Sequence, residues 1–266
     1  MDTVLHRWLG LPYRLAKPTD IGRGIPVVLL HGIGMSSRAW KPVVTRLQKQ
    51  PVRTVAFDLL GFGASPKPNW IQYDIDDHAS AVITSLKKLH AGPVVLVGHS
   101  LGALIALRVA RLRPDLVKHV ILYEMPLYDG LPQKARYKAR LAIYYAFYQW
   151  VVRQQPSFGE AKTQLTERLA NKFARAELTP ETWQPFVKSL QNSIMKQTAA
   201  SDIHQLRPRA DVVYGLLDMV VIRGKVADIF GRDLPHIKAH TITASHVISP
   251  SAAKFLVERI NEALTV

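Results

Sequence analysis

Residues 94–102, which read Val-Val-Leu-Val-Gly-His-Ser-Leu-Gly, decide the fold of this chain. The four leading apolar residues, mostly β-branched, predict a strand that is buried on both faces. A helical run over residues 103–113 follows at once, so the chain must turn sharply at Ser100. Such a turn strains the backbone of Ser100 and requires neighbours without side chains, which Gly98 and Gly102 provide. The pattern predicts a serine hydroxyl raised above the end of a strand.

Three other apolar runs predict further strands of the same sheet. Residues 25–30 lead into the turn His-Gly-Ile-Gly at 31–34, and residues 52–57 lead into a glycine-rich loop at 58–65. Residues 117–123 form the third run. Because helical patterns separate these runs, the strands are expected to be parallel, joined by right-handed crossovers. The functional site of such a sheet lies beyond the carboxyl ends of its strands.

Several polar residues near these turns are interpreted as structural. We expect His31 to hold its own turn together and the Asp58 carboxylate to bind backbone N–H groups of the loop at 61–65. His78 and His90 lie off the apolar stripe of the next predicted helix. Both are therefore expected at the surface.

The strand signal stops between residues 126 and about 204. In its place, residues 131–154, 157–176 and 179–197 predict helices, the second opened by a capping box at 157–160. Aromatic residues cluster at 144–148 on several helical faces, too many for one core-facing stripe. We expect at least two aromatic side chains of this segment to line an apolar pocket.

With these motifs the sequence resembles the α/β-hydrolase family, and within it the serine hydrolases that carry a Gly-x-Ser-x-Gly turn and a helical lid. The resemblance implies an α/β fold with a mostly parallel, doubly wound sheet and an inserted α-helical lid. Residues 1–125 and 206–266 then form the two parts of the core. Residues 126–205 form the lid.

The resemblance also implies a catalytic triad. Ser100 occupies the position of the nucleophile, and His246, in the loop after the last predicted strand, occupies that of the base. Asp218 follows the strand after the lid and is the preferred acid. Glu124 is its competitor, because it directly follows the preceding strand and some relatives with helical lids place the acid there.

The implied activity is hydrolysis of carboxylic esters of apolar acyl groups, through an acyl-enzyme, as in carboxylesterases and small lipases. The backbone N–H groups of Ile33 and Leu101 are expected to form the oxyanion hole. No metal and no organic cofactor is needed for this chemistry. Two alternatives stay open: a hydrolase of carbon–carbon bonds in diketone-type substrates, and a small-molecule-binding protein on a hydrolase scaffold.

Composition narrows the partners and the compartment. The 35 Lys and Arg against 20 Asp and Glu give a net charge of +15, but these residues are scattered and no nucleic-acid-binding motif accompanies them. We expect a small-molecule ester substrate, no specific nucleic acid and at most weak association with anionic surfaces. The lack of cysteine excludes disulfides and thiolate chemistry. Residues 1–11 have no apolar core of signal-peptide length, which favours a cytoplasmic protein. The oligomeric state stays open.

Overall fold

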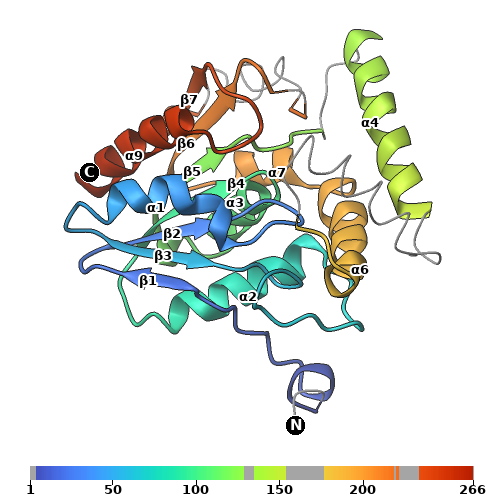
Figure 1. The fold of residues 1–266 in the computed structure, drawn as a ribbon, viewed down its shortest axis with the longest axis horizontal. Coiled ribbons are helices and arrows are strands. Elements are labelled where there is room, and N and C mark those ends of the chain that lie inside the picture. Colours follow the sequence, from blue (N-terminus) through green and yellow to red (C-terminus); the bar gives the residue numbers. More distant parts are fainter. Residues whose placement is uncertain (1–3, 129–134, 154–176, 219, 222–233, 266) are drawn as a thin grey trace.

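The computed structural model describes residues 4–128, 135–153, 177–218, 220–221 and 234–265. Within these residues the strands form one seven-stranded sheet of order β1-β3-β2-β4-β5-β6-β7 (Figure 1). Strand β1 is antiparallel to β3, and every other neighbouring pair is parallel. The strands are β1 Thr19–Ile21, β2 Pro26–Leu30, β3 Arg53–Phe57, β4 Val94–His99, β5 Val117–Tyr123, β6 Arg209–Gly215 and β7 Ile237–Ile242. The predicted α/β fold with a mostly parallel sheet is confirmed.

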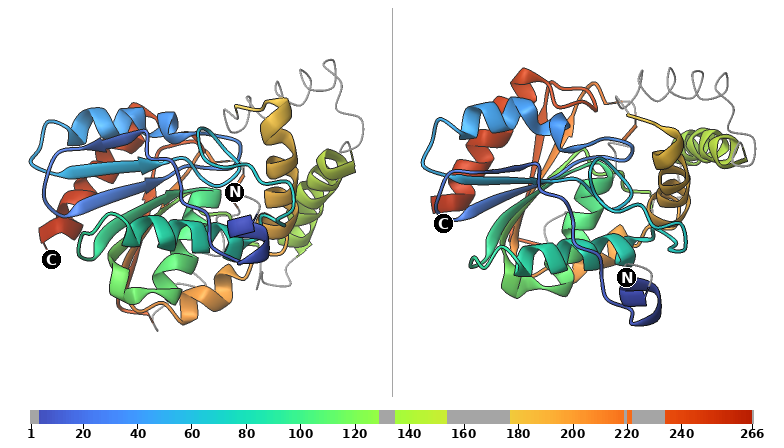
Figure 2. Two further views of the ribbon diagram at one scale, coloured as in Figure 1. Left: turned by 90° about the horizontal axis from the view of Figure 1, so that it is seen from below. Right: turned by 60° about the horizontal axis from the view of Figure 1, so that its bottom comes forward.

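Helices cover both faces of this sheet (Figures 1 and 2). Side chains alternate along each strand, so Val28 and Leu30 of β2 belong to the core beneath α2 and α3. Val27 and Leu29 belong to the opposite core, beneath α1 and α9. All four are fully buried, which explains why this strand is a continuous apolar run. The covering helices are α1 Lys41–Leu47, α2 Ile75–Lys87, α3 Leu101–Leu112 and α9 Pro250–Thr265.

A capping residue fixes the start of α2, and short helical turns occur elsewhere in the chain. The Asp74 side chain caps α2 by accepting hydrogen bonds from the backbone N–H groups of Asp76 and Asp77. Short helical turns are found at Val4–Trp8, Ser37–Trp40 and Pro114–Leu116, the second of which leads directly into α1. None of the helices in the part of the chain that the structure describes combines the length and the apolar character needed to cross a membrane.

The described residues between β5 and β6 form helices and no strand. The helix α4 lies within the predicted helix 131–154, whereas the predicted helix 157–176 and its capping box lie outside the described residues. The third predicted helix begins as α6, with Thr179 as its N-cap and Pro180 in its first turn, and continues into a π-helical turn. We refer to residues 126–205 as the inserted segment. Its described elements are α4 Ala135–Arg153, α6 Pro180–Ser189, the π-helical turn Leu190–Ile194 and α7 Ala199–His204.

Candidate active site

The turn between β4 and α3 has the strained geometry that the sequence predicts. Ser100 adopts a φ of 54° and a ψ of −119°, a conformation that side chains rarely allow. A Cβ atom at Gly98 would lie 2.2 Å from the carbonyl oxygen of Gly102, and one at Gly102 would lie 2.3 Å from that of Leu30. Neither position therefore tolerates a side chain without moving backbone. The Ser100 N–H is fixed by a 3.0 Å hydrogen bond to the carbonyl oxygen of Tyr123 on β5.

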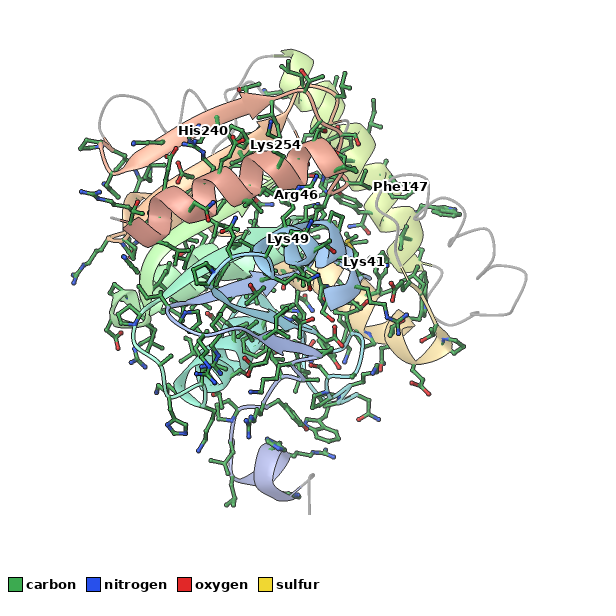
Figure 3. All side chains as sticks on the ribbon, turned by 60° about the vertical axis from the view of Figure 1, so that its left-hand side comes forward. Lys41, Arg46, Lys49, Phe147, His240 and Lys254 are labelled. Atoms are coloured by element: carbon green, nitrogen blue, oxygen red, sulfur yellow. The ribbon has the colours of Figure 1, made fainter. Side chains whose placement is uncertain are left out.

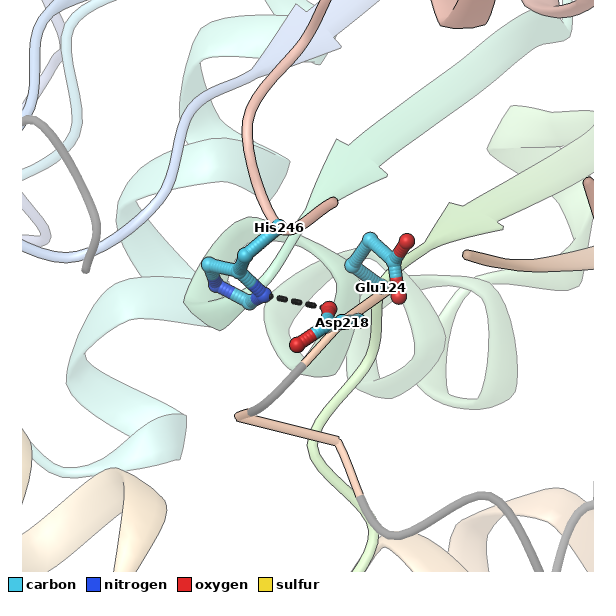
Figure 4. Close-up of side chains that lie close together, drawn as sticks. All are labelled: Glu124, Asp218 and His246. Atoms are coloured by element: carbon cyan, nitrogen blue, oxygen red, sulfur yellow. Dashed lines mark hydrogen bonds and ion pairs between the residues drawn. The ribbon is translucent and has the colours of Figure 1, made fainter. Parts of the chain in front are cut away.

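The structure brings Ser100, His246 and Asp218 together from the ends of three parallel strands, β4, β7 and β6. Nε2 of His246 lies 3.1 Å from Oγ of Ser100. Nδ1 of the same ring lies 2.7 Å from Oδ2 of Asp218, the contact drawn in Figure 4. All three side chains are buried, with exposed fractions of 5 %, 5 % and 1 %. In the ground state Nδ1 carries the proton that Asp218 accepts, so Nε2 is the nitrogen that can receive the Ser100 proton.

Asp218 is held as an anion. Its Oδ1 accepts hydrogen bonds from the backbone N–H groups of Val220, at 2.6 Å, and Val221, at 3.1 Å. Burial by itself raises the pKa of this carboxyl. The hydrogen bond and charge of His246 outweigh that effect, and contacts from Glu124 and Val220 add to them, so the pKa lies well below its usual range.

Glu124, the competing acid, lies beside this pair. It follows β5 directly and is completely buried. Atoms of Glu124, Asp218 and His246 that are able to ligate a metal lie within 4.8 Å of one another, and the described residues contain no second group of this kind. His246 and Asp218 are hydrogen-bonded to each other at 2.7 Å, so we assign no metal to this group. The direct contact with the His246 ring at Nδ1 is made by Asp218.

The glycine turn after β2 packs directly against the serine. A Cβ atom at Gly32 would lie 3.2 Å from Cβ of Ser100, so only glycine allows this approach. Ile33, the next residue, is 9 % exposed beside it. Leu101 is the first residue of α3, and the leading N–H groups of a helix have no intrahelical acceptor. Both expected oxyanion-hole residues therefore lie in the segments that surround the Ser100 hydroxyl.

Two residues interpreted as structural do hold the loops around the site. His31 donates from Nδ1 to the Gly32 carbonyl, at 2.8 Å, and accepts the Leu59 N–H on Nε2, at 2.8 Å. Burial lowers the pKa of His31 to about 4, so this ring is neutral and both its nitrogens are occupied. Asp58 accepts the backbone N–H groups of Ser37 and Ala64 on its two oxygens.

His99 has a place in the site that the sequence analysis missed. Its Nε2–H donates to the backbone carbonyl of His246, at 2.7 Å, and the two rings lie with centroids 5.0 Å apart. Burial, followed by the nearby charge of His246, lowers the pKa of His99 to about 3, so the ring stays neutral. Strand alternation could have indicated this position. His99 is two and four residues beyond Val97 and Val95 in β4, so its side chain points to the same face as theirs, which α9 covers.

The expectation of a surface position for His78 is wrong. His78 is 1 % exposed, and its Nε2 lies 3.0 Å from Oγ of Ser189 at the end of α6. The apolar stripe of α2 marks only the face that packs on the sheet, whereas the inserted segment covers a second face of the same helix. Burial lowers the pKa of His78 to about 3. His90 is exposed, as expected.

The inserted segment reaches the loop that carries Asp218. Tyr128 donates a hydrogen bond to the Val220 carbonyl oxygen, at 3.1 Å, and its hydroxyl lies 3.0 Å from that of Tyr148 on α4. The Tyr144 ring lies 5.9 Å from that of Tyr128. Since the Val220 N–H binds Asp218, a continuous set of contacts joins α4 to the site.

The fold and the site together define a hydrolase-type arrangement on a doubly wound sheet, and comparison with known proteins agrees. The profile of the alpha/beta hydrolase family matches residues 27–259. The chain therefore belongs to the alpha/beta hydrolase family.

Individual relatives are more distant. The chain is 38 % identical over 120 residues to a probable lysophospholipase, BODYGUARD 4, of Arabidopsis thaliana, covering 44 % of this chain and 28 % of the relative. It is 27 % identical over 216 residues to 2-hydroxy-6-oxo-2,4-heptadienoate hydrolase of Pseudomonas putida, covering 76 % of this chain and 75 % of that one. Among solved structures, an esterase from Exiguobacterium antarcticum is similar with a TM-score of 0.72 and 19 % identity, over 93 % of this chain and 94 % of that chain. The matched part of the Arabidopsis protein is thus under a third of its length.

Proposed function

We propose that this chain is a serine hydrolase that cleaves carboxylic esters of apolar acyl groups through a Ser100–His246–Asp218 triad. The observation that carries the proposal is the unbroken set of contacts from the serine hydroxyl through both imidazole nitrogens to a buried carboxylate, at 3.1 and 2.7 Å. This is the arrangement that activates a serine hydroxyl as a nucleophile.

The reaction follows from the positions of these atoms. Oγ of Ser100 attacks the ester carbonyl carbon while Nε2 of His246 accepts the hydroxyl proton. The Ile33 and Leu101 N–H groups stabilise the oxyanion of the tetrahedral intermediate, each donor lowering the barrier by about 3 kcal/mol. His246 then protonates the leaving alkoxide, and the acyl-enzyme forms. A water molecule, deprotonated by His246, releases the carboxylic acid and restores Ser100. Asp218 orients the imidazole and stabilises its protonated form throughout.

An apolar acyl group is favoured by the chemistry of the inserted segment. Tyr128 contacts the loop of Asp218, and the rings of Tyr144 and Tyr148 pack near that of Tyr128. Aromatic rings supply apolar contact area with few rotatable bonds. The inserted segment acts in this proposal as a lid that contributes the acyl pocket.

A second candidate reaction is supported by the Pseudomonas putida relative. Its named substrate, a 2-hydroxy-6-oxo-dienoate, contains neither an ester nor an amide bond, so its hydrolysis breaks a carbon–carbon bond. The same three residues would serve that reaction. A binding protein on this scaffold is the third candidate, and it predicts no turnover at all.

Hydrolysis of a p-nitrophenyl ester series, from acetyl to long acyl chains, tests the proposal. We expect turnover by the wild-type protein with a maximum at one chain length, lost in Ser100→Ala by at least about 10³-fold. Ser201→Ala, at an exposed position of α7, is the matched control and should retain full turnover. Turnover of a 2-hydroxy-6-oxo-dienoate without ester turnover would assign the second reaction instead. Failure of the folded protein on both substrates would leave the binding role.

A further inference from the structure

The backbone of Glu124 adopts a strained conformation. Its φ is +48°, in the left-handed region that only a few of the described non-glycine residues occupy. Its N–H donates to the Val213 carbonyl oxygen on β6, at 2.9 Å. Ser100, at the end of the neighbouring strand β4, is the other residue of the site with a positive φ, 54°. Strain of this kind persists where the surroundings enforce it, and it gathers at functional sites.

The chain leaves a space for the Glu124 carboxyl. A Cβ atom at Gly215 would lie 2.4 Å from Oε1 of Glu124, so a side chain at this position is incompatible with the carboxyl where it stands. The carboxyl group is completely buried and lies within 4.8 Å of the ligand-type atoms of Asp218 and His246 (Figure 4). Two carboxyl groups and one imidazole thus share a site without solvent.

Chemistry restricts how these two carboxyl groups are protonated. Asp218 is fixed as the anion by His246 and by two backbone N–H groups. A carboxyl oxygen of Glu124 lies within 4.8 Å of a carboxyl oxygen of Asp218. Burial beside a carboxylate disfavours a second negative charge, and two carboxyl groups can form a hydrogen bond only when one of them holds a proton.

The other titratable groups around the pair are Tyr123 on β5, Tyr214 on β6 and His99 on β4, together with Tyr128 and, on α4, Tyr148. Burial raises the pKa of Tyr128 and of Tyr148, so these two hydroxyls are neutral. Burial raises the pKa of Tyr123 and of Tyr214, and the nearby carboxyl groups raise it further. Both hydroxyls therefore stay neutral. His99 is neutral as well. These neighbours leave the Asp218 carboxylate as the charged group that decides the state of Glu124.

We propose that Glu124 is protonated at neutral pH and donates a hydrogen bond to Asp218, as a positioning residue of the triad rather than as its acid. The inference rests on the proposed function, since it assigns a role within that reaction. Glu124 then completes the set of donors that hold the Asp218 carboxylate toward Nδ1 of His246. It also withdraws part of the negative charge that Asp218 offers to the imidazole.

Two substitutions separate this role from its rivals. Glu124→Gln keeps the size of the side chain and an N–H donor, so kcat/KM should stay within about threefold of wild type, with the acidic limb of its pH profile unmoved. Glu124→Met keeps the approximate size but removes the donor, and kcat/KM should fall by about tenfold. Its acidic limb should move to higher pH, because an Asp218 with fewer donors stabilises protonated His246 more strongly.

A measurement that does not need turnover tests the proton directly. Infrared spectroscopy at neutral pH should show the C=O stretching band of a protonated carboxylic acid in the wild-type protein. The band should be absent from Glu124→Gln and present in Glu258→Gln, whose substitution is at an exposed position of α9. Thermal unfolding of each variant confirms that it is folded.

Three results would overturn the inference. An acidic limb that moves to lower pH in Glu124→Gln would mean that the substitution removed a negative charge, so Glu124 is ionised. A missing carboxylic-acid band in the wild type would mean the same. Identical pH profiles for wild type, Gln and Met variants would reduce Glu124 to a structural residue. If the band is present but no variant or wild type has turnover, the proposed function fails and the protonation of Glu124 stands.

Discussion

Strand β6 carries one aspartate near its start and is followed by another, and both bind histidines with different consequences. Asp211 accepts Nε2–H from His119 on β5, at 2.7 Å, and from His240 on β7, at 2.5 Å. Asp218 accepts Nδ1–H from His246, at 2.7 Å. In the first cluster each imidazole presents Nε2 to the acid. In the second, Nδ1 binds the acid and Nε2 faces Ser100, so a proton can pass between serine and histidine.

Position in the sheet separates the two clusters further. The Asp211 cluster connects three strands on the face that α9 covers. Figure 3 labels His240 beside α9, and its ring packs edge-to-face with the Phe255 ring, with centroids 5.5 Å apart. The Asp218 cluster lies beyond the carboxyl ends of the strands, beside the turn that raises Ser100. The same residue types therefore form a cross-strand link in one place and a proposed proton relay in the other.

Replacing Asp218 should have the largest effect on turnover. Asp218→Asn keeps the volume but removes the charge and disturbs the tautomer of His246, so we expect kcat to fall by about 10³- to 10⁴-fold. The protein should remain folded by circular dichroism, and steady-state ester hydrolysis measures the loss. Full turnover in Asp218→Asn, with inactivity in Glu124→Gln, would reverse the assignment of the acid.

Replacing Asp211 should lower the stability of the protein and leave turnover unchanged. Asp211→Asn weakens two partly buried hydrogen bonds, so the free energy of unfolding should fall by about 1–3 kcal/mol at neutral pH, with kcat retained. Burial raises the pKa of Asp211, but the hydrogen bonds from His119 and His240 outweigh this effect and lower the pKa. The difference between wild type and variant is thus full above the unfolded value of about 3.9 and is lost as the pH falls through the lower folded value. Denaturant titrations across this range measure it. A loss of kcat equal to that of Asp218→Asn would erase the distinction between the clusters.

A smaller effect is expected at His99, which fixes the backbone of the loop after β7. His99→Phe fills a similar space but removes the donor to the His246 carbonyl, so kcat should fall by about tenfold with KM little changed. Stopped-flow or steady-state kinetics on the best ester provides the readout. An unchanged kcat would show that the loop holds His246 without this hydrogen bond.

The smallest effect concerns the charged surface. One face of the molecule carries four basic residues (Figure 3). Two lie on α1, Lys41 and Arg46; Lys49 follows α1, and Lys254 lies on α9. We propose that this face gives weak binding to anionic vesicles, about 1 kcal/mol per basic residue at low ionic strength. Co-sedimentation should detect it with phosphatidylserine vesicles, and the combined Lys41→Glu and Lys49→Glu substitutions should reduce it. Equal binding to neutral vesicles, insensitive to salt, would contradict an electrostatic origin.

The sequence predicts those features of the fold and the site that depend on local geometry. Glycine is required at positions 32, 98 and 102 because a Cβ atom there would lie within 3.2 Å of neighbouring atoms. Such requirements are visible in the sequence as conspicuous glycines. The apolar runs predict the parallel strands because a strand buried on both faces has few polar positions.

What the sequence misses depends on how distant segments pack. The burial of His78 results from α6, which is 111 positions away at Ser189. The contact of Asp218, rather than Glu124, with the His246 ring depends on how the loops after β5, β6 and β7 converge. Periodicity within one element carries no information on either point, so spacing alone left both carboxyl groups as candidates for the acid.

Labelling with a fluorophosphonate tests the central claim most directly, because the reagent reacts with an activated serine and requires no knowledge of the substrate. Mass spectrometry after digestion should find the adduct on Ser100 in the wild-type protein, and the labelling rate should fall by at least about 10²-fold in Asp218→Asn. A folded wild-type protein that forms no adduct, or forms it on another serine, would contradict the triad.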